Sequence, residues 1–291
     1  MAKIYVISGN TSKGLARRIA NKLDATFVPA QIIKFPDGES KITLGKIPKK
    51  SIILIVQSTS PPVDTNLLQL LSMISQARKF SSKIYTIIPY MGYARQDRAF
   101  LGGEVITISV IAKMLESAGA KKIIVVDIHS KIALKHFKVK IENISAIPKL
   151  VNYFKKMKIR NPLIVSPDAG GIIRAKEFAR QFNSDFISLK KQRNRKTGKV
   201  KIQSPKMNLK NHDLILVDDM ISSGGSIIKA TQFLKKQGAG RIFVACTHAI
   251  LIDNAEKKIS KAGVKQIIST NTIHGKTAKV DVSDIIANSI K

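Results

Sequence analysis

The chain has 291 residues, of which 44% are hydrophobic, so it is long enough for two domains and apolar enough to form packed cores instead of a disordered chain. Its net charge of +31 suits anionic partners, but aromatic residues make up only 5% and the sequence contains no zinc-finger or RNA-recognition motif. We therefore expect small anionic substrates as partners and no physiological binding of nucleic acid.

Short β-rich runs alternate with amphipathic stretches along the whole chain. Strands are predicted at residues 3–8, 51–57, 83–89, 121–127, 163–166, 214–217 and 241–247. Helices are predicted at residues 66–80, 105–118 and 227–237. This alternation predicts an α/β fold in which parallel sheets are flanked by helices, and ligands of such folds bind at the carboxyl ends of the strands.

The two halves of the chain resemble each other. Residues 52–59 are an apolar strand followed by a helix, and residues 214–219 begin the same pattern. Residues 121–129 parallel residues 162–168 more loosely, because both are strands that end in polar residues. We therefore expect two copies of one α/β domain.

The first motif in chain order is Phe35-Pro36-Asp37-Gly38-Glu39. An aromatic ring at this position could stack on a nucleotide base while the polar residues bind the edge of the base. The same composition is also that of an ordinary β-turn, in which proline sets φ and glycine tolerates a positive φ. Taken alone, the motif favours the turn.

A second motif follows the predicted strand at residues 83–89. Arg95 and Arg98 could together neutralise a polyphosphate, and Gln96 could bind a base or a sugar. A surface ion-pair cluster that uses Asp97 is the alternative interpretation.

Two further polar residues come directly after predicted strands. His129 follows the strand at residues 121–127, where a lone histidine is more often structural or exposed than a ligand. Asp168 precedes two glycines in the turn after the strand at residues 163–166, and a carboxylate in that setting suits a Mg²⁺–phosphate contact. The chain has no P-loop motif, which excludes nucleotide binding through that device.

The most informative segment is residues 214–226, which read Leu-Ile-Leu-Val-Asp-Asp-Met-Ile-Ser-Ser-Gly-Gly-Ser and lead into a predicted helix. The amide groups and the dipole of a helix N-terminus bind anions, and glycines let the main chain approach a ligand closely. The carboxylates of Asp218 and Asp219 would repel a phosphate, so they suit sugar hydroxyls or a metal shared with the substrate. Although the same residue types form ordinary turns, the full arrangement predicts a site for a phosphorylated sugar.

The predicted boundary between the two copies lies near residues 142–149. It divides the chain into an N-terminal domain at residues 1–144 and a C-terminal domain at residues 145–291, whose extreme C-terminus we expect to pack back on the N-terminal domain. The first copy lacks the acid pair and the glycine pair of the second, so we expect its pocket to be degenerate.

The sequence also indicates a cellular compartment. The first residues, Met1 to Ile7, are typical of a strand and lack the long apolar stretch and cleavage site of a signal peptide. The apolar runs, such as residues 52–56, are too short to cross a bilayer. The single cysteine, Cys246, excludes an intramolecular disulfide, favours a reducing cytoplasm and is expected to be buried.

The segment at residues 214–226 resembles the phosphoribosyl-pyrophosphate-binding loop of the type I phosphoribosyltransferase fold. The resemblance implies that the two acids hold the ribose hydroxyls and that the serines and glycines hold the 5′-phosphate. The residues of this ribose-5-phosphate site are Asp218, Asp219, Ser222, Ser223, Gly224, Gly225 and Ser226. The loop alone does not separate transferases that consume phosphoribosyl pyrophosphate from the synthetase that makes it.

Taken together, the motifs resemble the ribose-phosphate diphosphokinase family, also called phosphoribosyl-pyrophosphate synthetases, in the same order and over nearly the whole chain. The length and the basic run at residues 190–201 resemble the archaeal members. The resemblance implies two tandem type I phosphoribosyltransferase-like domains, each a mainly parallel sheet flanked by helices. It also implies transfer of the pyrophosphoryl group of Mg-ATP to the anomeric hydroxyl of ribose 5-phosphate, which gives phosphoribosyl pyrophosphate and AMP for nucleotide biosynthesis.

The resemblance implies a role for each matching residue. Lys191 and Arg193 match the family's mobile catalytic loop, and Arg193 also contacts ribose 5-phosphate. His129 and Asp168 match positions that bind Mg²⁺. The ATP-binding residues are Phe35, Asp37, Gly38, Glu39, Arg95 and Gln96. Because the residues of the first motif would come from a neighbouring protomer, we expect a homo-oligomer, at least a dimer and up to a hexamer.

The sequence departs from the family's pattern at three places. The acid or threonine often found in the phosphate loop is replaced by serine, which keeps a hydroxyl donor, and Glu104-Val105 stands where Glu-Pro is frequent. The basic run is more cationic than expected, so Lys190 is an alternative to Lys191 as the catalytic lysine. Three other functions remain open: a phosphoribosyltransferase that acts on a base, a non-catalytic regulatory subunit, and a basic nucleic-acid-binding module.

Overall fold

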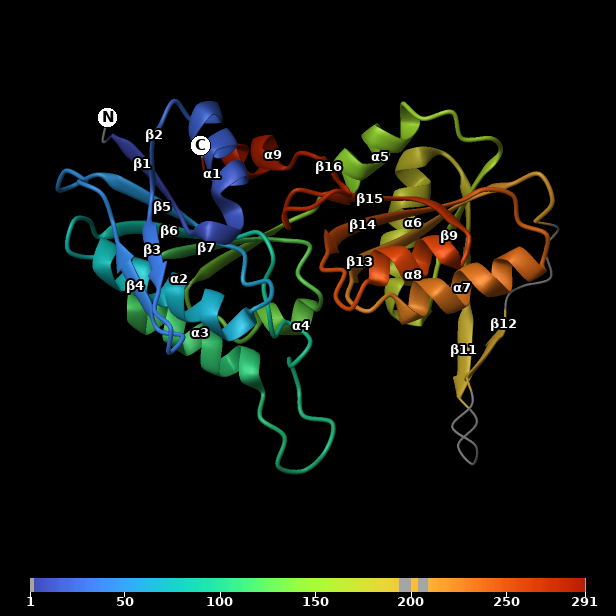
Figure 1. Cartoon of the computed structure of the whole chain (residues 1–291), viewed down its shortest axis with the longest axis horizontal. Coiled ribbons are helices and arrows are strands. Elements are labelled where there is room, and N and C mark those ends of the chain that lie inside the picture. Colours follow the sequence, from blue (N-terminus) through green and yellow to red (C-terminus); the bar gives the residue numbers. More distant parts are fainter. Residues whose placement is uncertain (1–2, 194–199, 204–208, 291) are drawn as a thin grey trace. The chain divides into compact units, whose positions relative to one another are not determined.

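The computed structural model describes residues 3–193, 200–203 and 209–290, which form two compact α/β units (Figure 1). Unit 1 comprises Met1–Ser145, Asn271–His274 and Asp281–Lys291, and unit 2 comprises Ala146–Thr270 and Gly275–Val280. Each unit contains a six-stranded sheet flanked by helices, which confirms the predicted α/β fold class. Within the described ranges, no helix combines the length and the apolar character that a bilayer crossing requires.

In unit 1 the sheet has the strand order β2-β1-β5-β6-β7-β8, and neighbouring strands are parallel. Its strands are β1 (Ile4–Ser8), β2 (Thr26–Pro29), β5 (Ile52–Val56), β6 (Lys83–Ile88), β7 (Lys122–Val126) and β8 (Lys140–Ile144). The helices are η1 (Asn10–Ser12), α1 (Lys13–Lys22), α2 (Val63–Ala77), α3 (Thr107–Ala118), α4 (Lys131–Leu134) and α9 (Ser283–Asn288). Helices α2 and α3 cover one face of this sheet, and α1 and α9 lie on the other (Figure 1).

In unit 2 the sheet has the strand order β10-β9-β13-β14-β15-β16, again with parallel neighbours. Its strands are β9 (Pro162–Ser166), β10 (Asp185–Ser188), β13 (Asp213–Ile221), β14 (Ile242–Ala249), β15 (Val264–Thr270) and β16 (Ala278–Val280). The helices are α5 (Ile147–Lys155), η2 (Ala169–Gly171), α6 (Ile172–Phe182), α7 (Gly225–Lys236) and α8 (Ala255–Lys261). Side chains of a strand alternate between the two faces of its sheet, so Leu214 and Leu216 belong to the core with α7 and α8, whereas Ile215 and Val217 belong to the core with α5 and α6.

The two sheets have the same topology, because in each unit the second strand lies at the edge and is followed by the first, third, fourth, fifth and sixth. An antiparallel hairpin precedes the third strand in both units: β3 (Gln31–Lys34) with β4 (Ser40–Thr43), and β11 (Lys190–Arg193) with β12 (Val200–Gln203). The predicted internal repeat is therefore present, with β5 equivalent to β13 as residues 52–59 and 214–219 indicated.

The second predicted correspondence, between residues 121–129 and 162–168, is wrong. Strand β7 is the fifth strand of its unit and is equivalent to β15, whereas β9 is a first strand and is equivalent to β1. Both segments end in polar residues only because the carboxyl ends of all strands in a parallel sheet meet at one edge, where ligands bind. A shared polar ending therefore does not identify equivalent strands.

The C-terminal segment returns to unit 1. Lys122 Nζ donates a hydrogen bond to the carbonyl oxygen of Ser289 at 2.7 Å, and Arg18 lies 3.6 Å from the carboxylate of Asp281. Exposed ion pairs contribute little to stability, so the burial of Ile286 and Ala287 of α9, which are at most 1% exposed, holds the segment in place.

The core beneath α5 provides a test of the fold. Phe154 is fully buried, and its ring meets the rings of Phe178 (centroid distance 5.9 Å) and Phe243 (6.5 Å) edge to face. We expect Phe154→Ala to lower the free energy of unfolding by about 3–5 kcal/mol, because the change removes buried apolar surface and leaves a cavity. Urea denaturation followed by circular dichroism measures this loss.

The matched control is Ile173→Ala on helix α6, whose side chain is 76% exposed. This change should alter the free energy of unfolding by less than about 0.5 kcal/mol. Equal effects of the two substitutions would contradict the described core.

Candidate active site

The acid pair lies inside strand β13. The sequence predicted a strand that ends at residue 217, but β13 continues to Ile221, so this prediction was wrong. The extension is paired with β14, in which Cys246 lies beside Asp218 and His248 lies beside Met220. Backbone hydrogen bonding along a parallel partner thus carries the two acids in an extended conformation to the carboxyl edge of the sheet.

The two acids start from opposite faces of the sheet. By the alternation of side chains along the strand, Asp219 starts on the face that is covered by α6. Its side chain is 2% exposed, and its Oδ2 lies 3.2 Å from a guanidinium nitrogen of Arg174 on that helix. Asp218 follows the residues that face α7, is partly exposed, and accepts a hydrogen bond from the backbone amide of Asp219 at 2.9 Å. The pair therefore consists of one buried, ion-paired carboxylate and one carboxylate nearer the surface.

The phosphate loop lies between the end of β13 and the start of α7. Ser223 and Gly225 are exposed, Ser226 is partly exposed, and α7 extends for 12 residues from Gly225. Gly224 has a φ of +78°, and a Cβ atom there would lie 2.7 Å from a side-chain carbon of Ile259. Glycine is therefore required at this position both by backbone conformation and by packing. The loop has the features of an anion-binding helix N-terminus.

Asp168 reaches the same edge of the sheet from β9, the neighbour of β13. Its Oδ1 accepts a hydrogen bond from the amide of Gly170 at 3.0 Å, and its carbonyl oxygen accepts one from Ser166 Oγ at 2.7 Å. These bonds fix the turn η2, which leads directly into α6 and hence to Arg174. The negative charge of Asp168 contributes to raising the pKa of Asp218, so the two carboxylates lie within interaction range.

Burial holds the pKa of Asp218 well above its usual range, and the negative charges of Asp219 and Asp168 raise it further, while Arg174 acts in the opposite direction. A divalent cation or sugar hydroxyls would relieve this crowding, and Mg²⁺ binds carboxylate oxygens together with water and substrate oxygens. The oxygen donors of unit 2 therefore fit Mg²⁺. In the described part of the chain, however, no group of three His, Cys, Asp or Glu side chains could hold a metal ion, so protein donors alone do not complete a site there.

Unit 1 holds the arginine motif and His129. Arg95 and Gln96 are exposed, whereas Asp97 is 4% exposed and accepts two hydrogen bonds of 3.1 Å from the guanidinium of Arg98. The hydrogen bond from Arg98 is the main cause that lowers the pKa of Asp97, and a hydrogen bond with Ser130, next to the exposed His129, adds to it. The ion-pair interpretation thus holds for Arg98, while Arg95 and Gln96 lie on a loop anchored through Asp97.

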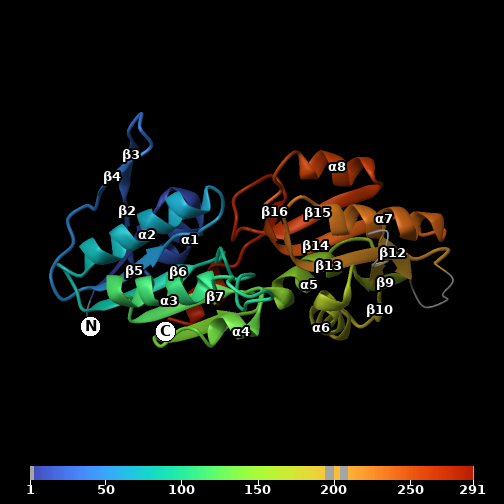
Figure 2. The same ribbon diagram turned by 90° about the horizontal axis from the view of Figure 1, so that it is seen from below.

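The Phe35 motif forms the tip of the hairpin β3–β4, which stands out from unit 1 (Figure 2). The amide of Phe35 donates a hydrogen bond to the carbonyl oxygen of Glu39 at 2.8 Å, and Asp37 Oδ1 accepts one from the amide of Glu39 at 3.1 Å. Gly38 has a φ of +97°, as a turn requires. The turn interpretation is therefore confirmed, and the turn presents the Phe35 ring, which is 43% exposed.

In unit 1, the loop equivalent to the phosphate loop is buried, and its side chains bond to other residues of the same unit. Gln57, Ser58 and Thr59 follow β5 and are at most 1% exposed. Ser58 Oγ donates a hydrogen bond to the carbonyl oxygen of Thr272 at 2.6 Å, and Thr11 Oγ1 donates one to Gln57 Oε1 at 2.9 Å. The polar groups of this loop are thus used within the unit, whereas in the loop of unit 2 Ser223 is exposed.

The catalytic residues expected in the basic run are only partly described. Lys191 and Arg193 belong to β11, where position 191 is paired with Ile202 and position 193 with Val200 of β12. Their side chains, and residues 194–199, lie outside the described part of the structure. The sequence did not indicate Arg174, because an arginine within an amphipathic helix carries no motif. Its position, six residues after Asp168 and in the first turn of α6, is the only signal that could have pointed to it.

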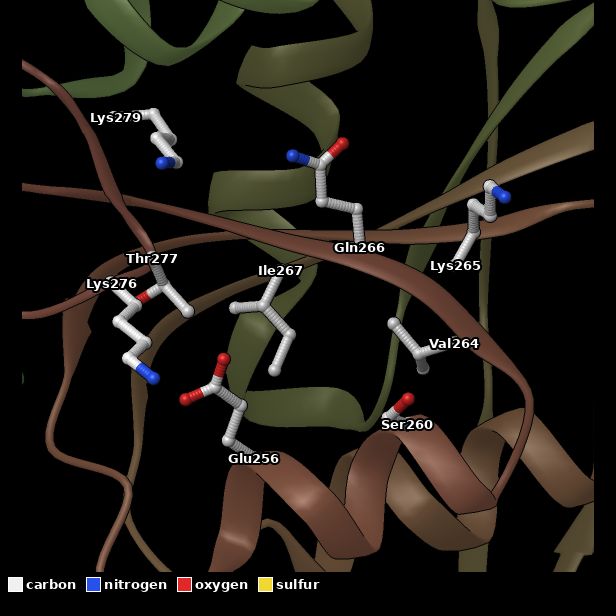
Figure 3. A pocket seen from close by; sticks show the side chains of 9 residues that line it. All are labelled: Glu256, Ser260, Val264, Lys265, Gln266, Ile267, Lys276, Thr277 and Lys279. Carbon is white, nitrogen blue, oxygen red and sulfur yellow. The ribbon is translucent and has the colours of Figure 1, made fainter.

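Unit 2 also contains a pocket of about 200 Å³ between α8, β15 and β16 (Figure 3). It is lined by Glu256, Ser260, Val264, Lys265, Gln266, Ile267, Lys276, Thr277 and Lys279. Strand β16 is paired with β15 only at Ser269 and Thr270, so the amino-terminal half of β15 is a sheet edge. Lysines beside an open edge prevent edge-to-edge pairing with another chain. We therefore interpret this pocket as a protected edge, separate from the candidate site.

Comparisons with known proteins agree with this arrangement. The family of the N-terminal domain of ribose phosphate pyrophosphokinase matches residues 4–119, and the phosphoribosyl transferase domain family matches residues 134–282. Ribose-phosphate pyrophosphokinases of Sulfurisphaera tokodaii and Saccharolobus solfataricus are 35% and 33% identical to the chain; the alignments cover 97% and 99% of this chain and 97% and 100% of theirs. The crystal structure of phosphoribosylpyrophosphate synthetase from Mycobacterium smegmatis superposes with a TM-score of 0.88 at 26% identity, covering 99% of this chain and 97% of that chain.

Two tandem α/β units, one of which carries a glycine-containing loop and a helix N-terminus after an acid pair, define an enzyme built from type I phosphoribosyltransferase-like domains. The chain belongs to the ribose-phosphate pyrophosphokinase family and is thus a diphosphotransferase of nucleotide biosynthesis. Both the fold class and the family predicted from the sequence are therefore confirmed. This assignment places the chain among the synthetases and not among the transferases that act on a base.

The raised pKa of Asp218 predicts a stability effect. A carboxyl group whose pKa is raised by folding destabilises the fold when it is ionised, so its cost is absent below the usual pKa of 3.8 and grows as the pH rises toward the raised value. We expect Asp218→Asn to stabilise the ligand-free protein at pH 8, by on the order of 1 kcal/mol, and to do so less at pH 5. Thermal unfolding in EDTA, which removes stabilising cations, measures the effect.

Asp213→Asn is the matched control on the same strand. Burial alone would raise the pKa of Asp213, but hydrogen bonds from the Arg241 side chain and the Arg160 amide lower it overall. Its contribution to stability is therefore present above pH 3.8 and lost as the pH falls through the lowered pKa, so this substitution should destabilise the protein by about 1–3 kcal/mol at pH 8. A loss of stability in both variants would contradict the charge crowding at Asp218.

Proposed function

We propose that the chain transfers the pyrophosphoryl group of Mg-ATP to the anomeric hydroxyl of ribose 5-phosphate, forming phosphoribosyl pyrophosphate and AMP. The observation that carries this proposal lies in unit 2, where the N-terminus of α7 follows shortly after the acid pair of β13 in the chain. An anion site and hydroxyl acceptors on adjacent residues suit a sugar that carries a phosphate at one end.

Ribose 5-phosphate would bind along the end of β13 and the start of α7. Its phosphate would accept hydrogen bonds from the loop Ser222–Ser226, whose serine hydroxyls replace the acid or threonine frequent in the family. The sugar hydroxyls would be bound by the acid pair Asp218 and Asp219. Donors and acceptors fixed by a strand end and a helix start hold the attacking hydroxyl in one orientation, which is the main contribution an enzyme can make to such a transfer.

ATP would bind through residues of unit 1. Arg95 can neutralise the polyphosphate, and Gln96 can bind the base or sugar; both are exposed on a loop anchored by Asp97. Phe35, Asp37, Gly38 and Glu39 would contribute from a neighbouring protomer. The exposure of the Phe35 ring at the tip of a protruding hairpin supports this role (Figure 2). A shared ATP site requires a homo-oligomer, at least a dimer and up to a hexamer, which would act in the cytoplasm.

Magnesium is the proposed metal. Asp168 in unit 2 and His129 in unit 1 are each proposed, separately, to contact Mg²⁺. The crowding of carboxylates around Asp218 supports a cation in unit 2. When bound, Mg²⁺ would neutralise the phosphate oxygens of ATP and draw sugar hydroxyls into its coordination shell. The hydrogen bond from Gly170 to Asp168 holds that carboxylate in one orientation.

Transfer begins when the anomeric oxygen of ribose 5-phosphate attacks the β-phosphorus of ATP; the hydroxyl loses its proton and AMP leaves. Lys191 and Arg193 would bind the β- and γ-phosphates and stabilise the charge that moves toward AMP. Positions two apart in a strand share one face, so positions 191 and 193 lie on the same face of β11 and position 190 lies on the other. This periodicity favours Lys191 over Lys190 as the catalytic lysine.

The decisive assay measures AMP and phosphoribosyl pyrophosphate after incubation of the purified protein with ATP, ribose 5-phosphate and Mg²⁺, with no base present. We expect equal amounts of the two products, and none when Mg²⁺ is omitted or ribose 5-phosphate is left out. A protein that forms no AMP under any of these conditions would be a non-catalytic member of the family, and the proposed activity would be wrong.

Lys191→Ala should lower kcat by about a hundredfold or more, because a positioned cation that stabilises transition-state charge is lost. The matched control is Lys190→Ala, which removes the same charge at the neighbouring position of β11 and should keep kcat within about threefold of wild type. Steady-state kinetics of AMP release measure both values. The assignment of Lys191 fails if the larger loss occurs in Lys190→Ala.

A further inference from the structure

The ion pair of Arg174 and Asp219 divides the acid pair into two unlike carboxylates. Asp219 is 2% exposed and its carboxylate lies 3.2 Å from Arg174, whose own side chain is only 20% exposed. Asp218, next in the chain, is partly exposed and lies on the α7 side, where the phosphate loop begins. Neighbouring side chains of a strand start from opposite faces of the sheet, and β13 continues past both acids, so the two carboxylates are held differently although their side chains interact.

Arg174 is also linked to the turn that carries Asp168. That turn, η2, runs without interruption into α6, and Arg174 lies on the first turn of that helix. The buried residues Ala175 and Phe178 fix the rotation of α6 against the sheet, so Arg174 is directed toward β13. One guanidinium thereby joins the element that carries Asp168 to the strand that carries the acid pair.

We propose that Arg174 is a positioning residue for the sugar site: it neutralises and orients Asp219, so that Asp218 alone of the two acids binds the ribose hydroxyls. The inference rests on the proposed function, because it concerns the binding of the same substrate. In this proposal the two acids are not equivalent hydroxyl acceptors: Asp218 is the acceptor, and Asp219 forms a structural ion pair with Arg174.

The charges explain why a cation is required at this position. When all three are ionised, the carboxylates of Asp168, Asp218 and Asp219 carry a charge of −3, and Arg174 reduces the sum to −2. A divalent cation would then balance the site. Without Arg174, the buried carboxylate of Asp219 loses this partner. A buried carboxylate that has lost its partner draws in other cations or turns away from its native position. Arginine suits the task better than lysine, because its planar fork fixes a carboxylate in orientation as well as in charge.

The test compares four variants: Arg174→Gln, Arg174→Lys, Asp219→Asn and Asp218→Asn. We expect Arg174→Gln to raise KM for ribose 5-phosphate by about tenfold or more and KM for ATP by less than about threefold. Arg174→Lys should recover part of the loss, since it keeps the charge but not the fork. Asp219→Asn should raise KM for ribose 5-phosphate much less than Asp218→Asn. A residue with a merely structural role would weaken both substrates equally.

The matched control is Arg180→Gln on the same helix. Arg180 pairs with Glu177 at 2.7 Å, but its side chain is 71% exposed, so the pair contributes little and both KM values should stay near those of wild type. A rise in KM for ribose 5-phosphate equal to that of Arg174→Gln would show a general effect of charge on α6 and overturn the proposal.

The double variant Arg174→Gln/Asp219→Asn separates positioning from simple loss of charge. Removing the carboxylate that Arg174 neutralises should restore ribose 5-phosphate binding by at least about threefold relative to Arg174→Gln alone. Multiplicative losses in the double variant, or equal losses in Asp219→Asn and Asp218→Asn, would overturn the proposal. Isothermal titration with ribose 5-phosphate gives the same comparison without turnover, so the outcome for Arg174 is decided even if the protein forms no AMP.

Discussion

Repulsion between carboxylates is the constraint on which the organisation of unit 2 depends. Asp168, Asp218 and Asp219 arrive at one edge of the sheet from two neighbouring strands, and burial, reinforced by the charges of the other two acids, holds the pKa of Asp218 well above its usual range. The fold tolerates this cost because Arg174 lies against Asp219 and because backbone pairing with β14 keeps the acids in place. Such stored repulsion disfavours the ligand-free state and favours cations and hydroxyl donors.

The same scaffold is used in two ways within one chain. In both units a third strand ends in a polar loop at the carboxyl edge of the sheet, but the loop after β5 is buried and bonded within unit 1, whereas in the loop after β13 Ser223 is exposed. Gly224 makes part of the difference, because its positive φ turns the chain into the N-terminus of α7. Topology therefore fixes where a ligand site is possible, and the residues at the strand end decide whether one exists.

The sequence predicted the buried, apolar elements well and the short polar ones poorly. Strands such as β5 and β6 are continuous apolar runs bounded by turn residues, so their positions were predicted within one or two residues. The hairpin β3–β4 was predicted only as a turn, because exposed strands with mixed polarity carry a weak periodic signal. The end of β13 was misplaced because charged residues usually mark a strand end, and only pairing with β14 keeps Asp218 and Asp219 extended. Residues in motifs could be identified from sequence; Arg174, whose role depends on a contact across the sheet, could not.

The distribution of charge along the chain supports a functional origin for the acid cluster. The chain has 50 lysine and arginine residues against 19 aspartate and glutamate residues, so acids are scarce. Placing three of these few acids at one edge of one sheet, at a cost to stability, is not what solubility or packing requires. The net positive charge of the chain favours anionic ligands over a range limited by salt, while carboxylates repel an anion that lacks hydroxyl groups or a bound cation. Attraction at long range and selection at short range would thus come from opposite charges, a combination that suits a phosphorylated, hydroxyl-bearing ligand.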